Sequence, residues 1–215
     1  MPEKIRVWDS AVRFFHWSQL LLLVALWYTG SEGYIAIHQL LAYSLAAIII
    51  CRLLWGVIGS QTARFRHFAA SPVKAITYIR RPYPVVGHNP ASSYMIFTLL
   101  ILVILQLLSG LATFDNSYMS DGPLVAYLNS DWVKLASDFH TLNIDIIIGL
   151  SVIHAGFALW HSFRHDNVLA TILTGRGSFD APEPGFKPAW IYFVLLGLLL
   201  IVLWFWQGKT LFALM

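Results

Sequence analysis

Five long apolar runs limit how this chain can fold more than any other feature of its sequence. They cover approximately residues 14–28, 35–58, 94–114, 140–163 and 188–206. A helix needs about 20 mostly apolar residues to cross the roughly 30 Å hydrocarbon core of a bilayer. The chain is 58% hydrophobic and only 12% charged, which is too apolar for an ordinary soluble domain of 215 residues. We therefore predict an all-α integral membrane protein with five transmembrane helices.

The basic residues predict how these helices are oriented. Twelve of the fourteen lie on one side of the predicted spans: Lys4, Arg6, Arg13, Arg52, Arg64, Arg66, Lys74, Arg80, Arg81, Arg164, Arg176 and Lys187. The loop between the third and fourth spans is acidic instead, with Asp115, Asp121, Asp131 and Asp138 against Lys134. By the positive-inside rule, the N-terminus is cytoplasmic, and the acidic loop and the C-terminal tail 207–215 lie outside. The net charge of +3 does not indicate nucleic-acid binding, because topology and anionic lipid explain basic residues beside spans.

Four histidines are the candidate functional residues, because histidine inside a bilayer is costly unless it is paired or bound to a ligand. His16 begins the first span and His38 begins the second, while His140 and His154 share the fourth. The alternating helix directions sort them by depth. His16 and His154 belong to the cytoplasmic half, and His38 and His140 belong to the outer half.

The spacing of His140 and His154 indicates what the histidines hold. Fourteen residues give roughly 21 Å along a helix, and the two side chains differ by only about 40° around its axis. That separation is too large for one metal ion and suits two stacked haems, each with one histidine from this helix and one from another. Two histidine ligands fill both axial positions of the iron, which favours electron transfer over oxygen binding.

Other interpretations of the histidines remain open from the residues alone. A haem-free proton relay or transporter also places histidines in a membrane. Zinc is disfavoured, because separations of this size leave no cluster of four ligands. His161 competes with His154, because it lies on the same helix face about 10 Å nearer the cytoplasm. We assign His67, His88, His161 and His165 to loops or the inner interface. Cys51 is the single cysteine, so there is no Cys-x-x-Cys-His site, and any haem is bound non-covalently.

The chain resembles the bacterial cytochrome b561 and nickel-iron hydrogenase b-type cytochrome family over about residues 7–177. The resemblance lies in these segments: Val-Arg-Phe-Phe-His-Trp at 12–17, Ile-His at 37–38, Arg-Leu-Leu-Trp at 52–55, Gly-His-Asn-Pro at 87–90, the His140 and His154 spacing, and Asp-Asn-Val-Leu at 166–169. Gly-His-Asn-Pro is closer to the hydrogenase branch than to the stand-alone quinol-oxidising branch. The family's four haem ligands correspond to His16, His38, His140 and His154.

The resemblance implies a four-helix di-haem domain over residues 1–177, followed by a linker and a fifth transmembrane helix over 178–215. It also implies transmembrane electron transfer between the quinone pool and a periplasmic partner, either a hydrogenase-like protein or a c-type cytochrome. The chain is then an electron-transfer subunit with quinone oxidoreductase activity in the bacterial inner membrane. A self-sufficient superoxide or quinol oxidoreductase is the alternative.

Other polar residues in the spans complete the predicted site. Arg52 lies fourteen residues after His38, level with the inner haem, and Arg13 lies one turn before His16, so either guanidinium could hold a haem propionate. Both also fit interfacial anchors. Asp145 could relay protons or pair with a neighbouring helix. Gln19 and Gln106 fit hydrogen bonds between helices better than a quinone site.

Overall fold

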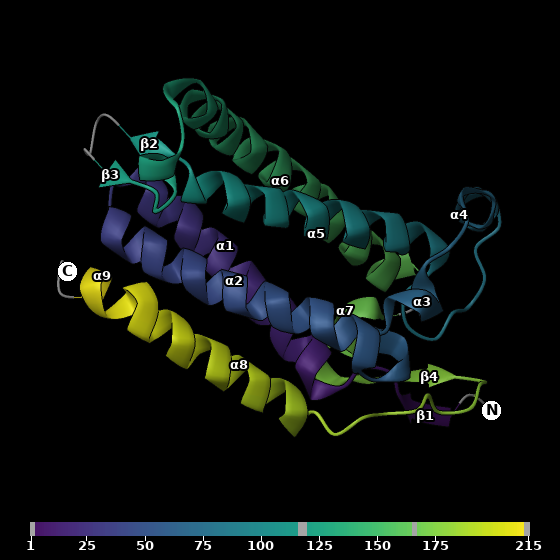
Figure 1. Cartoon of the computed structure of the whole chain (residues 1–215). Helices are drawn as coiled ribbons and strands as arrows, with labels where there is room; N and C mark the ends of the chain where they lie inside the picture. Colours follow the sequence, from purple (N-terminus) through teal and green to yellow (C-terminus); the bar gives the residue numbers. More distant parts are fainter. Residues whose placement is uncertain (1–2, 116–119, 165–166, 213–215) are drawn as a thin grey trace.

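Five long helices run side by side and form the body of the protein (Figure 1). The computed structural model describes residues 3–115, 120–164 and 167–212. The long helices are α1 (Ser10–Ser31), α2 (Ile35–Ile58), α5 (Pro90–Leu111), α6 (Ser130–Arg164) and α8 (Trp190–Leu203), and a π-helical turn extends α8 to Gly208. All five are long and apolar enough to cross a membrane, which confirms the predicted fold class. The protein is a multi-pass membrane protein.

Local sequence sets where these helices begin. The carboxylate of Asp9 accepts a hydrogen bond from the Val12 amide at 2.7 Å and caps α1. Asn89 caps α5 in the same way through the Ser92 amide, and Pro90 occupies the first helical position, where proline is tolerated. The fourth span was expected at 140–163, but α6 begins ten residues earlier. Polar residues continue the helix beyond the apolar segment, so Asp131 and Asp138 are helical rather than part of a loop.

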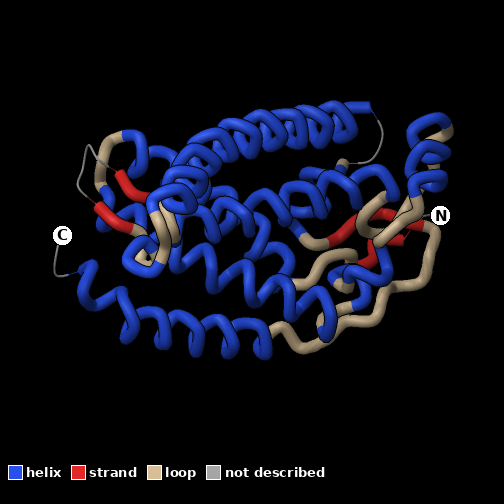
Figure 2. The backbone as a smooth tube through the Cα atoms, turned by 45° about the horizontal axis from the view of Figure 1, so that its top comes forward, coloured by secondary structure: helices blue, strands red, loops and turns tan. Residues whose placement is uncertain are grey.

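Short elements close the two ends of the bundle. The remaining helices are α3 (Phe65–Phe68), α4 (Pro72–Arg80), α7 (Val168–Thr174) and α9 (Lys209–Phe212). Strand β1 (Glu3–Arg6) pairs antiparallel with β4 (Arg176–Phe179), and β2 (Phe114–Asp115) pairs with β3 (Ser120–Asp121). The two small sheets lie at opposite ends of the molecule (Figure 2). The sequence did not predict these strands, because two to four residues carry too little periodicity to be recognised.

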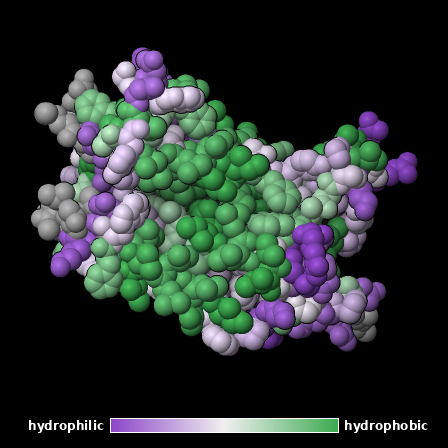
Figure 3. Space-filling model, in the orientation of Figure 1, coloured by the Kyte–Doolittle hydropathy of each residue, from purple (hydrophilic) through white to green (hydrophobic). Residues whose placement is uncertain are grey.

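Hydropathy divides the surface into three zones. On the face shown in Figure 3, a broad band of hydrophobic side chains covers the middle, and hydrophilic residues gather at both ends. This is the distribution that a bilayer requires of a protein that spans it. The end that carries α3, α4, β1 and β4 is opposite the end that carries β2, β3 and α9 (Figure 1).

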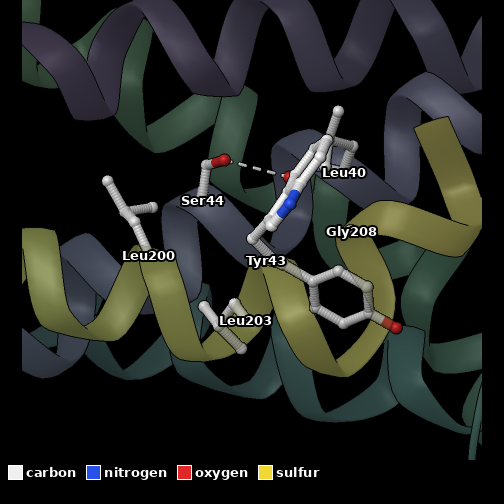
Figure 4. A pocket seen from close by; sticks show the side chains of 7 residues that line it. Leu40, Tyr43, Ser44, Leu200, Leu203 and Gly208 are labelled. Atoms are coloured by element: carbon white, nitrogen blue, oxygen red, sulfur yellow. Dashed lines mark hydrogen bonds between the residues drawn. The ribbon is translucent and has the colours of Figure 1, made fainter.

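Helix α8 is added to the outside of the bundle against α2 (Figure 1). Between the two helices is a cavity of about 150 Å³. It is lined by Leu40, Tyr43, Ser44, Leu200, Leu203, Trp204 and Gly208 (Figure 4). The Ser44 hydroxyl donates to the Leu40 carbonyl at 3.0 Å, so it is already satisfied within α2. No histidine lines this cavity, which separates it from the candidate site.

Candidate functional site

The inner histidine pair brings together α1 and α6. The rings of His16 and His154 face each other with their centroids 6.4 Å apart and their planes tilted by 52°. The Nδ1 atom of His16 is buried and has no hydrogen-bond partner among the described residues. His16 thus lies opposite His154, the histidine predicted at the same depth.

The outer pair brings together α2 and α6. The rings of His38 and His140 also have centroids 6.4 Å apart, with an angle of 77° between their planes. Nδ1 of His38 lies 2.9 Å from the Leu26 carbonyl oxygen, and Nδ1 of His140 lies 3.0 Å from that of Gln106. A carbonyl oxygen can only accept, so each Nδ1 carries the proton and donates it. Nε2 of each ring is therefore unprotonated and keeps its lone pair. A metal would bind at this nitrogen.

Two glycines make room for the outer rings. A Cβ atom added to Gly30 in α1 would lie 3.1 Å from the His38 ring, and one added to Gly110 in α5 would lie 2.9 Å from the His140 ring. Both distances are below ordinary van der Waals contact, so a side chain at either position would push the imidazole out of place. The outer rings are thus held in two ways. Nδ1 donates to a backbone carbonyl, and the backbone of a glycine lies close to the ring.

A buried amide network ties α5 to α6 beside His140. The Asn143 amide donates to the Leu102 carbonyl at 2.9 Å and to the Gln106 side-chain oxygen at 2.8 Å. The Gln106 amide donates in turn to the His140 carbonyl at 3.0 Å. Gln106 therefore forms the interhelical hydrogen bonds that its sequence suggested, whereas the side-chain oxygen of Gln19 has no partner within the described chain. Such bonds inside a membrane contribute about 0.6–2 kcal/mol each, enough to fix the register of two helices.

The space between the two rings of each pair would admit a metal ion held by both imidazoles. An imidazole nitrogen binds a metal ion at about 2.0–2.1 Å, so the rings of a ligand pair must stand apart. Both observed separations are 6.4 Å. The four side chains thus suit two separate haems, and their ligation of iron stays a prediction.

Arg52 is a buried cation with one donor atom that has no partner among the described residues. Its side chain is 3% exposed, and its guanidinium lies over the rings of Phe15 and Phe65 at 5.6 and 4.7 Å. The Nη1 atom has no hydrogen-bond partner in the described structure. The buried carboxylate of Asp9 offsets part of the Arg52 charge, and a haem propionate would supply the partner that Nη1 lacks. The geometry therefore fits the role predicted for Arg52.

The Arg13 side chain donates to backbone carbonyls of α7. Its Nε donates to the Ile172 carbonyl at 3.3 Å, and its Nη2 donates to the Leu173 carbonyl. Both carbonyls belong to the last turn of α7, whose unpaired oxygens a cation stabilises. The structure thus gives Arg13 a different set of partners from the propionate that the sequence suggested.

His88 lies in the loop before α5, as the sequence predicted, and belongs to the inner end of the site. Its ring lies between those of Trp8 and Phe68, with centroid distances of 4.5 and 4.6 Å. Burial, together with the positive charge of Arg52 and the inner histidines, lowers the pKa of His88 to about 3. Its position in the Gly-His-Asn-Pro segment was the available signal, but only the tertiary structure brings that segment beneath the inner pair. His67 is exposed, and His165 and Asp166 lie outside the described residues.

A bundle of membrane-spanning helices that carries two facing histidine pairs has the architecture of a membrane cytochrome. The family model for prokaryotic cytochrome b561 matches residues 7–175, so the chain belongs to that family. It is also 23% identical over 220 residues to the protein named "Probable Ni/Fe-hydrogenase B-type cytochrome subunit" from Rhizobium leguminosarum bv. viciae. The match covers 84% of this chain and 92% of that protein. The predicted family is confirmed, and with it membrane electron transfer by a b-type cytochrome that carries haem b.

Proposed function

We propose that the chain carries electrons across the bacterial inner membrane through two b haems. His16 and His154 bind the inner iron, and His38 and His140 bind the outer iron. The observation that carries this proposal is the presence of two facing pairs with the same centroid separation of 6.4 Å. A bound haem supplies a one-electron redox centre, and two of them at different depths supply a route through the bilayer.

The protein's own residues would hold and tune each centre differently. At the outer pair, hydrogen bonds from Nδ1 to the Leu26 and Gln106 carbonyls fix the tautomer and raise the basicity of the ligating nitrogen. At the inner pair, the buried Arg52 guanidinium would neutralise a propionate.

The orientation follows from charge. With the twelve basic residues on the cytoplasmic side, the N-terminus is cytoplasmic and the C-terminus is periplasmic. Met215 itself lies outside the described residues. The outer haem then faces a periplasmic partner, either a hydrogenase, as the name of the Rhizobium relative suggests, or a c-type cytochrome. Membrane quinone is the other electron-transfer partner of the chain.

The proposed domain boundary separates the haem-binding helices from the fifth helix. Residues 1–177 form the di-haem unit, and residues 178–215 add the linker and the fifth helix. Helices α1, α2 and α6 supply every proposed iron ligand, whereas α8 supplies none. Strand β4 ends at Phe179, close to this boundary, and ties the end of the unit back to β1.

Haem stoichiometry and spectra test the proposal directly. The purified protein should show reduced-minus-oxidised b-type bands and contain two haems per chain. Electron paramagnetic resonance should show low-spin ferric iron in both, as bis-histidine ligation requires. A preparation with full α-helical content and no b-type bands after haem supplementation would refute the proposal. A single haem per chain would refute the two-centre route.

A further inference from the structure

Asp145 is a carboxylate near the middle of the membrane that the proposed electron route does not use. Its depth follows from its neighbour Asn143, whose amide donates to the Leu102 carbonyl. Leu102 lies near the middle of α5 (Pro90–Leu111), and Asp145 is two residues farther along α6 toward the cytoplasmic end. It therefore lies at mid-depth, where an acidic side chain is costly and marks a functional contact by default.

The Asp145 side chain points away from the histidines. Five steps of about 100° turn it roughly 140° from His140 around the helix axis. The residue is exposed, and no hydrogen bond or ion pair is found for it within the described residues. A second element must lie against it in the membrane, because lipid tails offer a carboxylate nothing to bind.

The helix face around Asp145 is shaped to receive another helix. Gly149, Val152 and Gly156 lie within about 40° of Asp145 around the axis of α6, and all are exposed. A Cβ atom added at either glycine would meet nothing within 4 Å. Small residues on one helix face allow close backbone approach, which is the usual basis of helix association in membranes. Helix α6 lies at the edge of the bundle, where such a partner has access (Figure 1).

The charge of Asp145 indicates the chemistry of that partner. A second copy of this chain could not neutralise it. Of the lysines and arginines in the long helices, Arg52 is buried, and Arg13, Lys134 and Arg164 lie near the ends. We propose that the Asp145–Gly149–Gly156 face of α6 binds a transmembrane helix of another protein that carries a lysine or arginine at mid-depth. This face is opposite the histidines of α6, so the proposal does not depend on which residues bind haem.

A designed helix tests the proposal with the full chain in lipid vesicles. The probe is a Leu/Ala transmembrane peptide of about 24 residues with one central lysine, and its control has leucine in place of that lysine. Energy transfer between a donor at the C-terminus of the protein and an acceptor on the peptide reports binding. The wild-type chain should bind the lysine peptide about tenfold more tightly than its control.

Two variants separate the charge from the shape of the face. Asp145→Asn should abolish the preference for the lysine peptide, whereas Gly149→Leu should weaken the binding of both peptides. Haem content, measured in each variant, checks that the bundle is intact. The proposal is overturned if the wild-type chain binds both peptides equally or if Asp145→Asn keeps the preference. It is also overturned if the wild-type chain self-associates through Asp145 and excludes the peptide.

Discussion

Replacing one histidine of a pair should remove one haem and leave the other in place. The two pairs share α6, where His140 and His154 are fourteen residues apart, or about 21 Å along the axis. His154→Ala removes one of the two rings of the inner pair, whose centroids are 6.4 Å apart, and leaves the His16 ring in place. The outer pair, more than a haem's width away, keeps both ring contacts and both Nδ1 hydrogen bonds.

The expected magnitude is therefore about one haem lost of two. His154→Ala and His16→Ala should each lower haem content to about one per chain and remove the same component from a redox titration. His38→Ala and His140→Ala should remove the other component. Added imidazole should partly restore the inner haem in His154→Ala, because the deleted ring leaves a space of its own size.

His161→Ala is the matched control, because position 161 is on the same helix seven residues beyond His154. It should keep both haems and both midpoint potentials. The pairing is wrong if His16→Ala and His140→Ala remove one shared component while His154→Ala spares it. An intact His154→Ala beside a damaged His161→Ala would instead move the inner ligand to His161.

Three further predictions concern orientation, docking and acid stability. Asp121→Cys should react with an impermeant thiol reagent from the periplasmic side only. Cys51 is buried and should not react. Labelling from the cytoplasm alone would reverse the orientation. Changing Asp115, Asp121 and Asp131 to asparagine should slow electron transfer with a periplasmic partner about tenfold at low salt; a rate indifferent to both salt and these changes would exclude electrostatic docking. His88 should destabilise the protein in acid, because an unfolded histidine takes up a proton below pH about 6.5 while the folded pKa is about 3. At pH 5 the loss of stability in thermal unfolding should be about 2 kcal/mol larger in the wild-type protein than in His88→Gln; equal acid sensitivity of both proteins would contradict it.

The five spans could be predicted because apolar length is a local property. A bilayer requires about 20 apolar residues per helix whatever the neighbours are, so each run could be recognised by itself. The alternation of helix direction then assigned a depth to each histidine. This is why His16 was matched with His154, and His38 with His140, before any contact was known.

The second layer of the site could not be predicted, because it depends on which atoms of different helices meet. A hydrogen bond between helices could be predicted for Gln106, but not that its partners are Asn143 and the His140 carbonyl. The loop histidine His88 gave no sign that it would be enclosed by Trp8 and Phe68. Arg13 has the right spacing for a propionate, but the fold turns its donors to α7.

The sequence alone determined the number of spans, from apolar length, and the two histidine levels, from spacing and alternating helix direction. Its motifs also resemble those of the family. The tertiary structure decided which ring nitrogen is free, which donors of Arg13 and Arg52 have partners and which face of α6 is uncovered. These properties depend on helix rotation and on contacts between residues far apart in the chain. Asp145 makes the difference plain: its sequence gives a carboxylate in a span, and only the packing of α6 against α5 shows that the carboxylate faces away from the bundle.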